Sequence, residues 1–364
     1  MKRILAIFIL LLFCGCSQTE QQSQTEAILS SMTLEEKCYQ MLVVSPEALT
    51  GIGTAIQAGD ATKQALTTHP VGGIMYLAKN LKSQKQVTEM LANTRQYATI
   101  PPFLSVDEEG GAVARVASTL NTTSFSPMYT YRNDGSSVAY DNAATIAKDL
   151  YSLGFNQNYA PVADVWTNPD NQVIATRAYS NTPETAAELV ASAVKGFQDN
   201  GIIATLKHFP GHGETAEDTH TQTAFSYKSL EELFSCEFLP FQAGISAGAD
   251  FVMCAHITVP KVDNVPATLS KIFITNILRG ELGFQGVVIT DAMEMGAISD
   301  QYSSDVAAVK AIQAGCDMIL CPEDMQLAIQ GILDAVSKGE LSEERIDQSV
   351  RRILSVKEKY GLLS

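Results

Sequence analysis

Short apolar runs alternate with longer amphipathic stretches along most of this chain. The apolar runs are rich in β-branched residues and read as buried strands. The eight runs are QMLVVS from Gln40, VGGIMYL from Val71, FLSVD from Phe103, FNQNYAPVADV from Phe155, IIATLKHF from Ile202, FVMCAHI from Phe251, GVVITDA from Gly286 and DMILCPE from Asp317. Since strands separated by helices form parallel sheets, the pattern predicts repeated β/α units.

The stretches between these runs have the periodicity of amphipathic helices. Examples begin at Ser83, Thr182 and Ser303, and a charged amphipathic helix, SEERIDQSVRRILSVKEKYG, follows the last strand. Thr182 is predicted as an N-cap, with Pro183 as the first helical residue. Eight β/α units predict an α/β fold, a single-domain (β/α)8 TIM-type barrel over residues 27–364. An open doubly wound sheet is the alternative, which the strand count disfavours.

The chain begins with a positive MKR, an apolar ILAIFILLLF and then a cysteine pair around Gly15. The apolar run is too short to span a bilayer comfortably, so it predicts an export signal. Gly15 before Cys16 resembles a bacterial lipoprotein signal. The resemblance implies a signal over residues 1–16, lipid on Cys16 and a flexible tether over residues 17–26. The alternative is a simple cleaved secretory peptide.

A lipid on Cys16 predicts an exported protein anchored on a membrane of the cell envelope, and Ser17 is compatible with an outer membrane. The rest of the composition is that of a globular protein, with 46% hydrophobic residues and a formal net charge of −15. Such a charge repels nucleic acid, so we expect no nucleic-acid partner. The cysteines after Cys16 are odd in number and scattered, which predicts buried free thiols.

Polar residues follow several of the predicted strands at their carboxyl ends, where a barrel builds its active site. These residues are Asp107, Asp164, Arg177, Lys207, His208, His256 and Asp291. A charge directly after an apolar strand is costly unless it has a partner or a function. We therefore predict one site at this rim. Asp164 is predicted either to bind substrate or to brace Lys207, and His256 to touch the pocket wall outside the core set.

The segment KHFPGHGETAEDTH, from Lys207 to His220, concentrates histidines. His208 and His212 have the four-residue spacing of a zinc-binding pair on a helix. Pro210 and Gly211 would break a helix between them, so the segment predicts a loop after a strand and no metal site. His212 is expected to shape that loop. The glycine pairs elsewhere lack the spacing of a nucleotide-binding loop, so no cofactor is expected.

The motifs KHFPGHG, Asp218-Thr219-His220, DEEGGAVAR and VVITDAMEMGAI together resemble glycoside hydrolase family 3. Within it they are similar to the single-domain bacterial β-N-acetylglucosaminidases, and the resemblance covers nearly the whole mature chain. It implies that Asp291 is the nucleophile and that Asp218 and His220 form an acid/base dyad. It further implies that the substrate is held by Asp107, Arg177, Lys207 and His208. Glu108 and Glu109 remain open between sugar ligands, charges that support the sugar-binding residues from behind, and helix-start charges.

Retaining cleavage of a glycoside needs a carboxylate that traps the anomeric carbon and a second group that transfers a proton. Asp291 fits the first requirement, and a histidine oriented by an aspartate fits the second. The expected reaction is hydrolysis of terminal non-reducing β-linked N-acetylglucosamine, from peptidoglycan fragments or chitin-like oligomers. The alternatives are a phosphorylase using the same intermediate, a catalytically silent glycan-binding lipoprotein, and, for Asp291 taken alone, a strand-end partner of Lys207.

Overall fold

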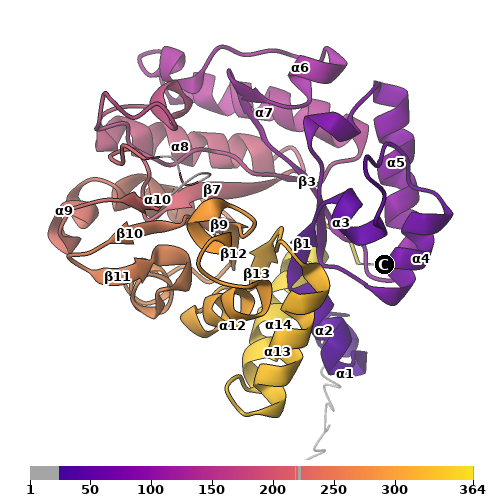
Figure 1. The fold of residues 1–364 in the computed structure, drawn as a ribbon. Helices are drawn as coiled ribbons and strands as arrows, with labels where there is room; N and C mark the ends of the chain where they lie inside the picture. Colours follow the sequence, from indigo (N-terminus) through magenta and orange to yellow (C-terminus); the bar gives the residue numbers. More distant parts are fainter. Residues whose placement is uncertain (1–23, 218, 220–222, 364) are drawn as a thin grey trace, which may run out of the picture.

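The computed structural model describes residues 24–217, 219 and 223–363. Its centre is a closed barrel of eight parallel strands (Figure 1). In barrel order they are β1 (Leu42–Val44), β13 (Met318–Leu320), β12 (Val287–Ala292), β9 (Phe251–Cys254), β7 (Ile203–Phe209), β6 (Gln157–Asn158), β3 (Phe103–Val106) and β2 (Gly73–Met75). Each predicted run contributes one strand, so the prediction of a (β/α)8 barrel is confirmed.

One strand is much shorter than its predicted run. The run from Phe155 yields only β6, and the ladder stops before Pro161. Proline has no N–H to donate, so it interrupts a central ladder. Beyond it, Val162 forms a single bridge with Lys207 of β7, which still ties this segment to the barrel.

Helices surround the barrel and follow its strands (Figure 1). The α-helices are α1 (Gln24–Ser31), α2 (Leu34–Gln40), α3 (Pro46–Thr50), α4 (Asp60–Thr68), α5 (Gln84–Tyr97), α6 (Ala117–Leu120), α7 (Ser136–Leu153), α8 (Pro183–Gln198), α9 (Leu230–Ser235), α10 (Phe238–Ser246), α11 (Gly296–Ser299), α12 (Ser304–Ala314), α13 (Met325–Ser337) and α14 (Glu343–Lys359). The 3₁₀ turns are η1 (Ala78–Asn80), η2 (Met128–Tyr131), η3 (Ala175–Arg177) and η4 (Ala267–Leu269), and η5 (Ile272–Glu281) is a π-helix.

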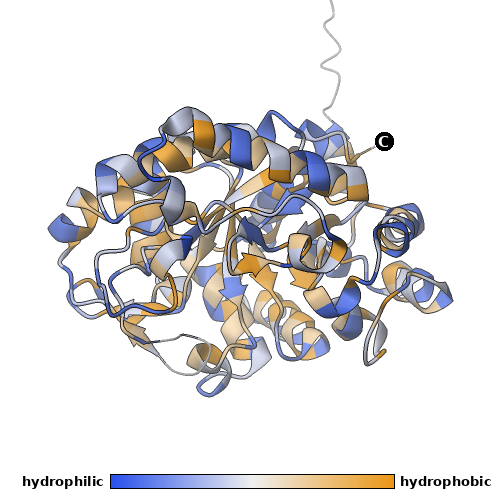
Figure 2. Cartoon of the chain, turned by 90° about the horizontal axis from the view of Figure 1, so that it is seen from above, coloured by the Kyte–Doolittle hydropathy of each residue, from blue (hydrophilic) through white to orange (hydrophobic). Residues whose placement is uncertain are grey.

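The hydrophobic pattern explains this arrangement. Figure 2 shows hydrophobic residues on the central strands and on the helix faces turned toward them. β7 is buried along its whole length, as the apolar, β-branched residues at its start predict. Helix α8 begins where predicted, with Thr182 at the N-cap and Pro183 after it. The Thr182 side chain does not cap the helix, however; its hydroxyl lies 3.2 Å from that of Ser180.

The N-terminal boundary differs from the prediction. Helix α1 begins at Gln24, so residues 24–26 of the predicted tether are helical. Polar contacts tie this helix to α14: the Thr25 hydroxyl donates to Glu358 at 2.5 Å, and Arg351 pairs with Glu26 at 2.5 Å. Nothing in the composition of this polar segment signals those partners, since they lie at the other end of the chain. In the part of the chain that the structure describes, no helix has both the length and the apolarity to cross a membrane.

Two small sheets lie in the loops that leave the barrel strands. β4 (Glu108–Gly110) and β5 (Val113–Ala114) form an antiparallel hairpin directly after β3. β8 (Ala224–Phe225), β10 (Ile257–Val259) and β11 (Asp263–Pro266) form the second sheet, which joins the loops after β7 and β9. These loops thereby frame the end of the barrel to which the strands point.

Candidate active site

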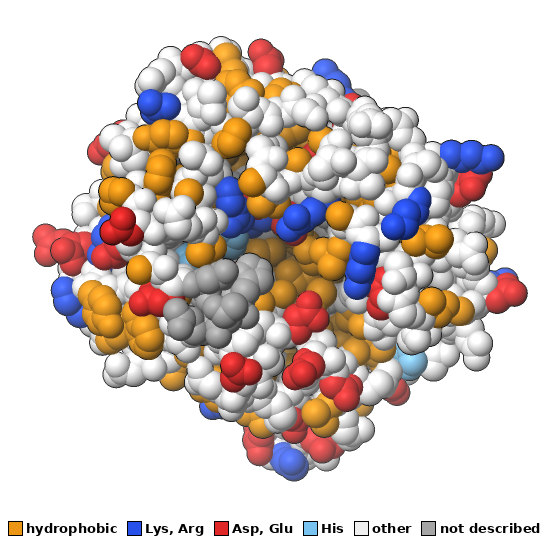
Figure 3. All heavy atoms as spheres, turned by 45° about the horizontal axis from the view of Figure 1, so that its top comes forward, with side chains coloured by type: hydrophobic (Ala, Val, Ile, Leu, Met, Phe, Trp, Pro, Cys, Tyr) orange, Lys and Arg blue, Asp and Glu red, His pale blue; other side chains and the backbone are white. Residues whose placement is uncertain are grey.

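A pocket of about 390 Å³ opens at the carboxyl ends of the barrel strands. This volume is typical of a small-molecule site. Figure 3 shows the hollow, with hydrophobic side chains inside it, basic side chains along one edge and acidic ones along the opposite edge. The apolar part of the lining includes Met75, Tyr159, Met253 and Leu320. The charged part contains every predicted substrate-binding residue and Asp291, so the structure brings these residues together.

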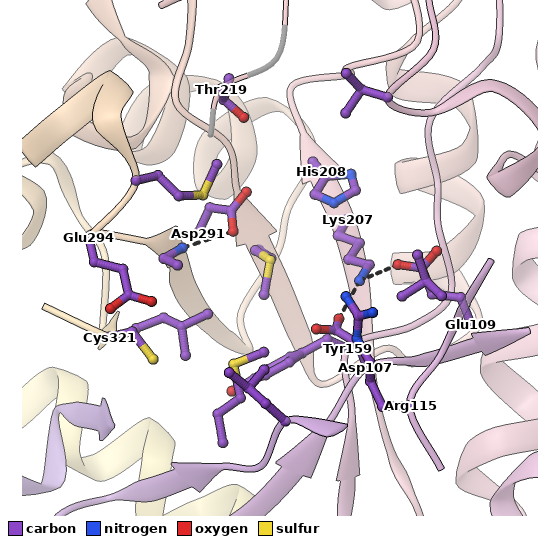
Figure 4. A pocket seen from close by; sticks show the side chains of 18 of the residues that line it. Asp107, Glu109, Arg115, Tyr159, Lys207, His208, Thr219, Asp291, Glu294 and Cys321 are labelled. Atoms are coloured by element: carbon purple, nitrogen blue, oxygen red, sulfur yellow. Dashed lines mark hydrogen bonds and ion pairs between the residues drawn. The ribbon is translucent and has the colours of Figure 1, made fainter. Parts of the chain in front are cut away.

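The charged wall is a network built around Lys207 (Figure 4). Lys207 Nζ lies 2.7 Å from Asp107 Oδ1 and 2.5 Å from Glu109 Oε1. Arg177 donates two hydrogen bonds to Glu109, Nε to Oε2 at 2.9 Å and Nη2 to Oε1 at 2.8 Å. Such a bidentate ion pair fixes the plane of the Arg177 guanidinium. Glu109 therefore holds both cations in place at the pocket wall.

The charges of this network stabilise each other despite their burial. Burial alone would raise the pKa of Glu109, but Lys207 and Arg177 outweigh it and hold that pKa well below its usual range. Burial alone would lower the pKa of Lys207, but Asp107 and Glu109 outweigh it and raise that pKa. Both groups are thus charged at neutral pH, and the wall carries fixed hydrogen-bond donors.

Glu108 points elsewhere and has a different role. Its carboxylate accepts hydrogen bonds from the backbone N–H groups of Val116 at 2.6 Å and Ala117 at 3.2 Å, where α6 begins. Burial nevertheless raises the pKa of Glu108 to about 7. Of the open possibilities for this residue, the structure favours the helix-start charge.

Asp164 braces two histidines, which corrects one of its two predicted roles. Its Oδ2 lies 2.7 Å from His208 Nδ1, and its Oδ1 accepts from the backbone N–H groups of His208 at 3.2 Å and His212 at 2.7 Å. It does not brace Lys207, whose ion pairs are with Asp107 and Glu109. Asp164 is fully buried, so it orients His208 from behind the pocket wall.

The loop after β7 is held close to the barrel at His212. The His212 carbonyl accepts from Asn171 Nδ2 at 2.7 Å, and its Nδ1 lies 2.5 Å from the Thr215 hydroxyl. The next residue, Gly213, has no room for a side chain, because a Cβ there would lie 1.8 Å from the Val165 carbonyl oxygen. His212 shapes the loop as predicted, and its ring also lines the pocket.

Asp291 stands on β12, across the pocket from the Lys207 network (Figure 4). Its Oδ1 accepts a hydrogen bond of 2.8 Å from the backbone N–H of Ala292. Burial alone would raise the pKa of Asp291, but His208, His256 and this hydrogen bond outweigh it and lower the pKa. Asp291 is therefore an ionised carboxylate on the pocket wall. The alternative pairing with Lys207 is not found, since Lys207 pairs with Asp107 and Glu109.

Some residues of the pocket were missed from the sequence. Arg115, in the loop after β5, lines the pocket and makes no ion pair with any described residue. Glu294 and Tyr159 also line it. Arg115 lies in the DEEGGAVAR segment, and its charge at the end of that motif is the signal that could have found it.

The remaining predicted site residues, Asp218 and His220, lie outside the described residues, as does Cys16. Thr219, between the dyad positions, is buried and lines the pocket. Within residues 24–217, 219 and 223–363, no group of three or more His, Cys, Asp or Glu side chains is arranged to hold a metal ion.

The chain is similar to known glycosidases in sequence. It is 34% identical over 327 residues to the protein named beta-hexosaminidase A from Pseudoalteromonas piscicida, covering 81% of this chain and 54% of the relative. It is 37% identical over 269 residues to a beta-hexosaminidase from Stenotrophomonas maltophilia, covering 72% of this chain and 80% of the relative. The chain thus spans about half of the first relative and most of the second.

The fold is similar to that of a solved enzyme as well. A glycoside hydrolase family 3 beta-N-acetylglucosaminidase from Paenibacillus sp. str. FPU-7 superimposes with a TM-score of 0.86 at 39% identity, over 92% of this chain and 64% of that one. Residues 33–356 match the family described as glycosyl hydrolase family 3 N terminal domain. That match covers the whole barrel and every described residue of the site, so this chain belongs to glycoside hydrolase family 3.

Proposed function

We propose that this protein is a retaining β-N-acetylhexosaminidase that removes terminal non-reducing β-linked N-acetylglucosamine. The observation that carries the proposal is an ionised Asp291 facing a wall of fixed cations and carboxylates in a family 3 barrel. The names of its relatives, beta-hexosaminidases and a beta-N-acetylglucosaminidase, support the choice of sugar.

Asp291 is suited to nucleophilic attack because its two oxygens differ. Oδ1 is held by the Ala292 N–H, which orients the carboxylate. In the first step an Asp291 oxygen bonds to the anomeric carbon while the glycosidic C–O bond breaks and the leaving oxygen takes a proton. In the second step, water attacks the same carbon and the Asp291 ester bond breaks, which restores the carboxylate.

The proton in both steps would be carried by His220, supported by Asp218. This assignment rests on the family motif alone, because both residues lie outside the described ranges. A histidine suits the task, since its ordinary pKa lies near neutral pH and it can both donate and accept. Asp218 would orient the imidazole and stabilise its charged form.

The charged wall supplies sugar recognition. Lys207 and Arg177 offer N–H donors to sugar hydroxyls, and Asp107 offers a carboxylate acceptor. His208 is oriented by Asp164 and reaches the pocket beside Arg177, with its Nε2 3.4 Å from Arg177 Nη2. Because Glu109 fixes both cations beforehand, little side-chain freedom is lost when sugar binds. The apolar lining can receive the less polar face of the ring.

The proposed substrates are peptidoglycan fragments or chitin-like oligomers that end in N-acetylglucosamine, met at a membrane of the cell envelope. The membrane part rests on the signal-like segment and Cys16. Fatty-acid labelling of the protein in cells is its test: labelling that persists in Cys16→Ala would contradict the lipid anchor.

The reaction is tested by release of aryl alcohol from an aryl β-N-acetylglucosaminide. We expect turnover that phosphate does not change and that falls at least ~10³-fold in Asp291→Ala. Asp134→Ala, which replaces an exposed aspartate, is the matched control and should be unchanged. Strong phosphate stimulation with a sugar 1-phosphate product would establish a phosphorylase instead. A folded wild type that binds glycan without turnover would make the chain a binding protein.

A further inference from the structure

The strand that carries Asp291 is irregular where the nucleophile stands. β12 pairs with β13 through Ile289 opposite Met318 and then Ala292 opposite Leu320. Between these two pairs β12 therefore has one residue more than β13, which is a β-bulge. At this bulge the Leu320 N–H donates to the Thr290 hydroxyl at 3.0 Å. Bulges redirect side chains at active sites and leave the strand locally unpaired. Beyond the bulge the Met293 N–H donates to the Leu320 carbonyl at 2.9 Å, so β13 holds the end of β12 on one side.

His256 supplies a second anchor from the other side, in the segment directly after β9. It is fully buried between β9 and β10, and its Nε2 lies 3.0 Å from the carbonyl oxygen of Ala292. A carbonyl oxygen can only accept, so Nε2 carries the hydrogen of this bond. The His256 ring therefore holds Ala292, the residue that directly follows Asp291, in place.

The other side of the ring is fixed as well. His256 Nδ1 lies 2.9 Å from the Thr268 hydroxyl, in η4. That hydroxyl lies 2.7 Å from the Ala255 carbonyl oxygen and 3.0 Å from that of Cys254, to which it can donate. The imidazole is thus held by η4 at one nitrogen while it holds β12 at the other.

We propose that His256 is a positioning residue for the nucleophile. Its bond holds the Ala292 carbonyl from the side of β9, and the Ala292 N–H in turn holds Asp291 Oδ1 at 2.8 Å. The chain of contacts runs from Thr268 through His256 and Ala292 to the carboxylate that attacks. A nucleophile displaced by about 1 Å loses on the order of 10²-fold in rate. The inference rests on the proposed function and deepens it.

Two substitutions separate positioning from packing. In His256→Gln the side-chain amide can reach the place of Nε2 and still donate to Ala292, whereas in His256→Asn it reaches only the place of Nδ1. We expect His256→Asn to lower kcat by roughly 10² with KM within about twofold, and His256→Gln to stay within about fivefold of wild type. His69→Gln, an imidazole replaced outside the pocket, is the matched control.

The readouts are kcat, KM and the melting temperature of each full-length variant on the aryl glycoside. Equal losses in the Gln and Asn variants, or losses that follow the melting temperature, would overturn the proposal. If His256→Asn does not fold, Thr268→Val decides, because it keeps His256 and frees its Nδ1. A folded Thr268→Val with unchanged kcat would count against positioning, and a lower kcat at unchanged KM would support it.

The failure of the proposed function is a different result. It would appear as a folded wild type without turnover on the aryl glycoside. The positioning of Asp291 would then be judged from crystal structures of the Gln and Asn variants. An Asp291 carboxylate that moves in His256→Asn but not in His256→Gln supports the proposal, and one that moves in neither overturns it.

Discussion

The two ends of the barrel both bury charged groups, but these groups point to different partners. At the amino-terminal end, Asp317 precedes β13 and is fully buried. Its carboxylate pairs with Arg279, and it accepts from Arg352 at 3.0 Å, the Ser349 hydroxyl at 2.8 Å and the Val288 N–H at 3.0 Å. All of these partners belong to the scaffold.

At the carboxyl end, by contrast, the charged groups line a pocket. Lys207, Arg177 and Asp291 are fixed by neighbours but face a space in which a ligand fits. The difference teaches that a buried charge alone does not mark a functional site. In such barrels the amino-terminal face serves stability and the carboxyl face serves chemistry, and the direction of the polar atoms distinguishes them here.

The largest effect on stability is expected from Asp317→Asn. The change leaves Arg279, Arg345 and Arg352 without their shared counter-charge, and removing one partner of a buried ion pair costs about 3–5 kcal/mol. Denaturant unfolding measures this loss. Because the site lies at the other end of the barrel, kcat and KM of the folded protein should not change. A variant with wild-type stability, or with altered KM, would contradict the contrast between the two ends.

A smaller, mixed effect is expected from Glu109→Gln. The change removes the carboxylate that holds Lys207 and Arg177, while Lys207 keeps Asp107. We expect kcat/KM to fall roughly 10–100-fold and the free energy of unfolding by about 2 kcal/mol. Glu108→Gln is the matched control, since it changes a neighbouring buried carboxylate outside the Lys207 network. Equal losses of kcat/KM in the two variants would show that the network has no special role in binding.

The pH dependence of the Glu109→Gln effect has a defined sign. The pKa of Glu109 is lowered in the folded protein by Lys207 and Arg177 against the effect of burial. Its stabilising contribution is therefore complete above the ordinary carboxyl pKa of 4.5 and is lost as the pH falls through the lower folded pKa. The stability difference between wild type and variant should be constant near neutral pH and shrink below about pH 4.5. A difference that grows with acidity would contradict the ion-pair explanation.

The barrel could be predicted from the sequence because its strands are local signals. Each apolar run, such as that of β7, can be recognised from its composition and from the polar residue at its end. The length of β6 was overestimated, since the run continues in composition although Pro161 ends the ladder. The helical start at Gln24 was missed, because its partners Arg351 and Glu358 are distant in sequence.

Several residues of the pocket, namely Asp107, Arg177, Lys207, His208 and Asp291, were predicted from the sequence, but their contacts were not. Position at a strand end indicated Asp107, Lys207 and Asp291, whereas the partner of each depends on three-dimensional geometry. Asp164 was expected to brace Lys207 or to bind substrate, yet it holds His208, near the end of β7, and His212, in the loop that follows the strand. Spacing along the chain carries no information about such turns.

The smallest expected effect on stability concerns Lys357, which also lies at the amino-terminal end of the barrel. This lysine is fully buried, with its Nζ 2.8 Å from Gln40 Oε1, and burial lowers its pKa to about 7. Between pH 7 and its ordinary pKa of 10.5, the unfolded chain binds the proton that the folded one has lost, so wild-type stability rises with pH there. Lys357→Met removes this pH dependence. Between pH 7 and 9 the free energy of unfolding of the wild type should therefore rise by about 1 kcal/mol or more relative to that of the variant. A stability difference that does not change with pH would mean that Lys357 stays charged and that Gln40 and the nearby Phe103 ring suffice to hold its charge.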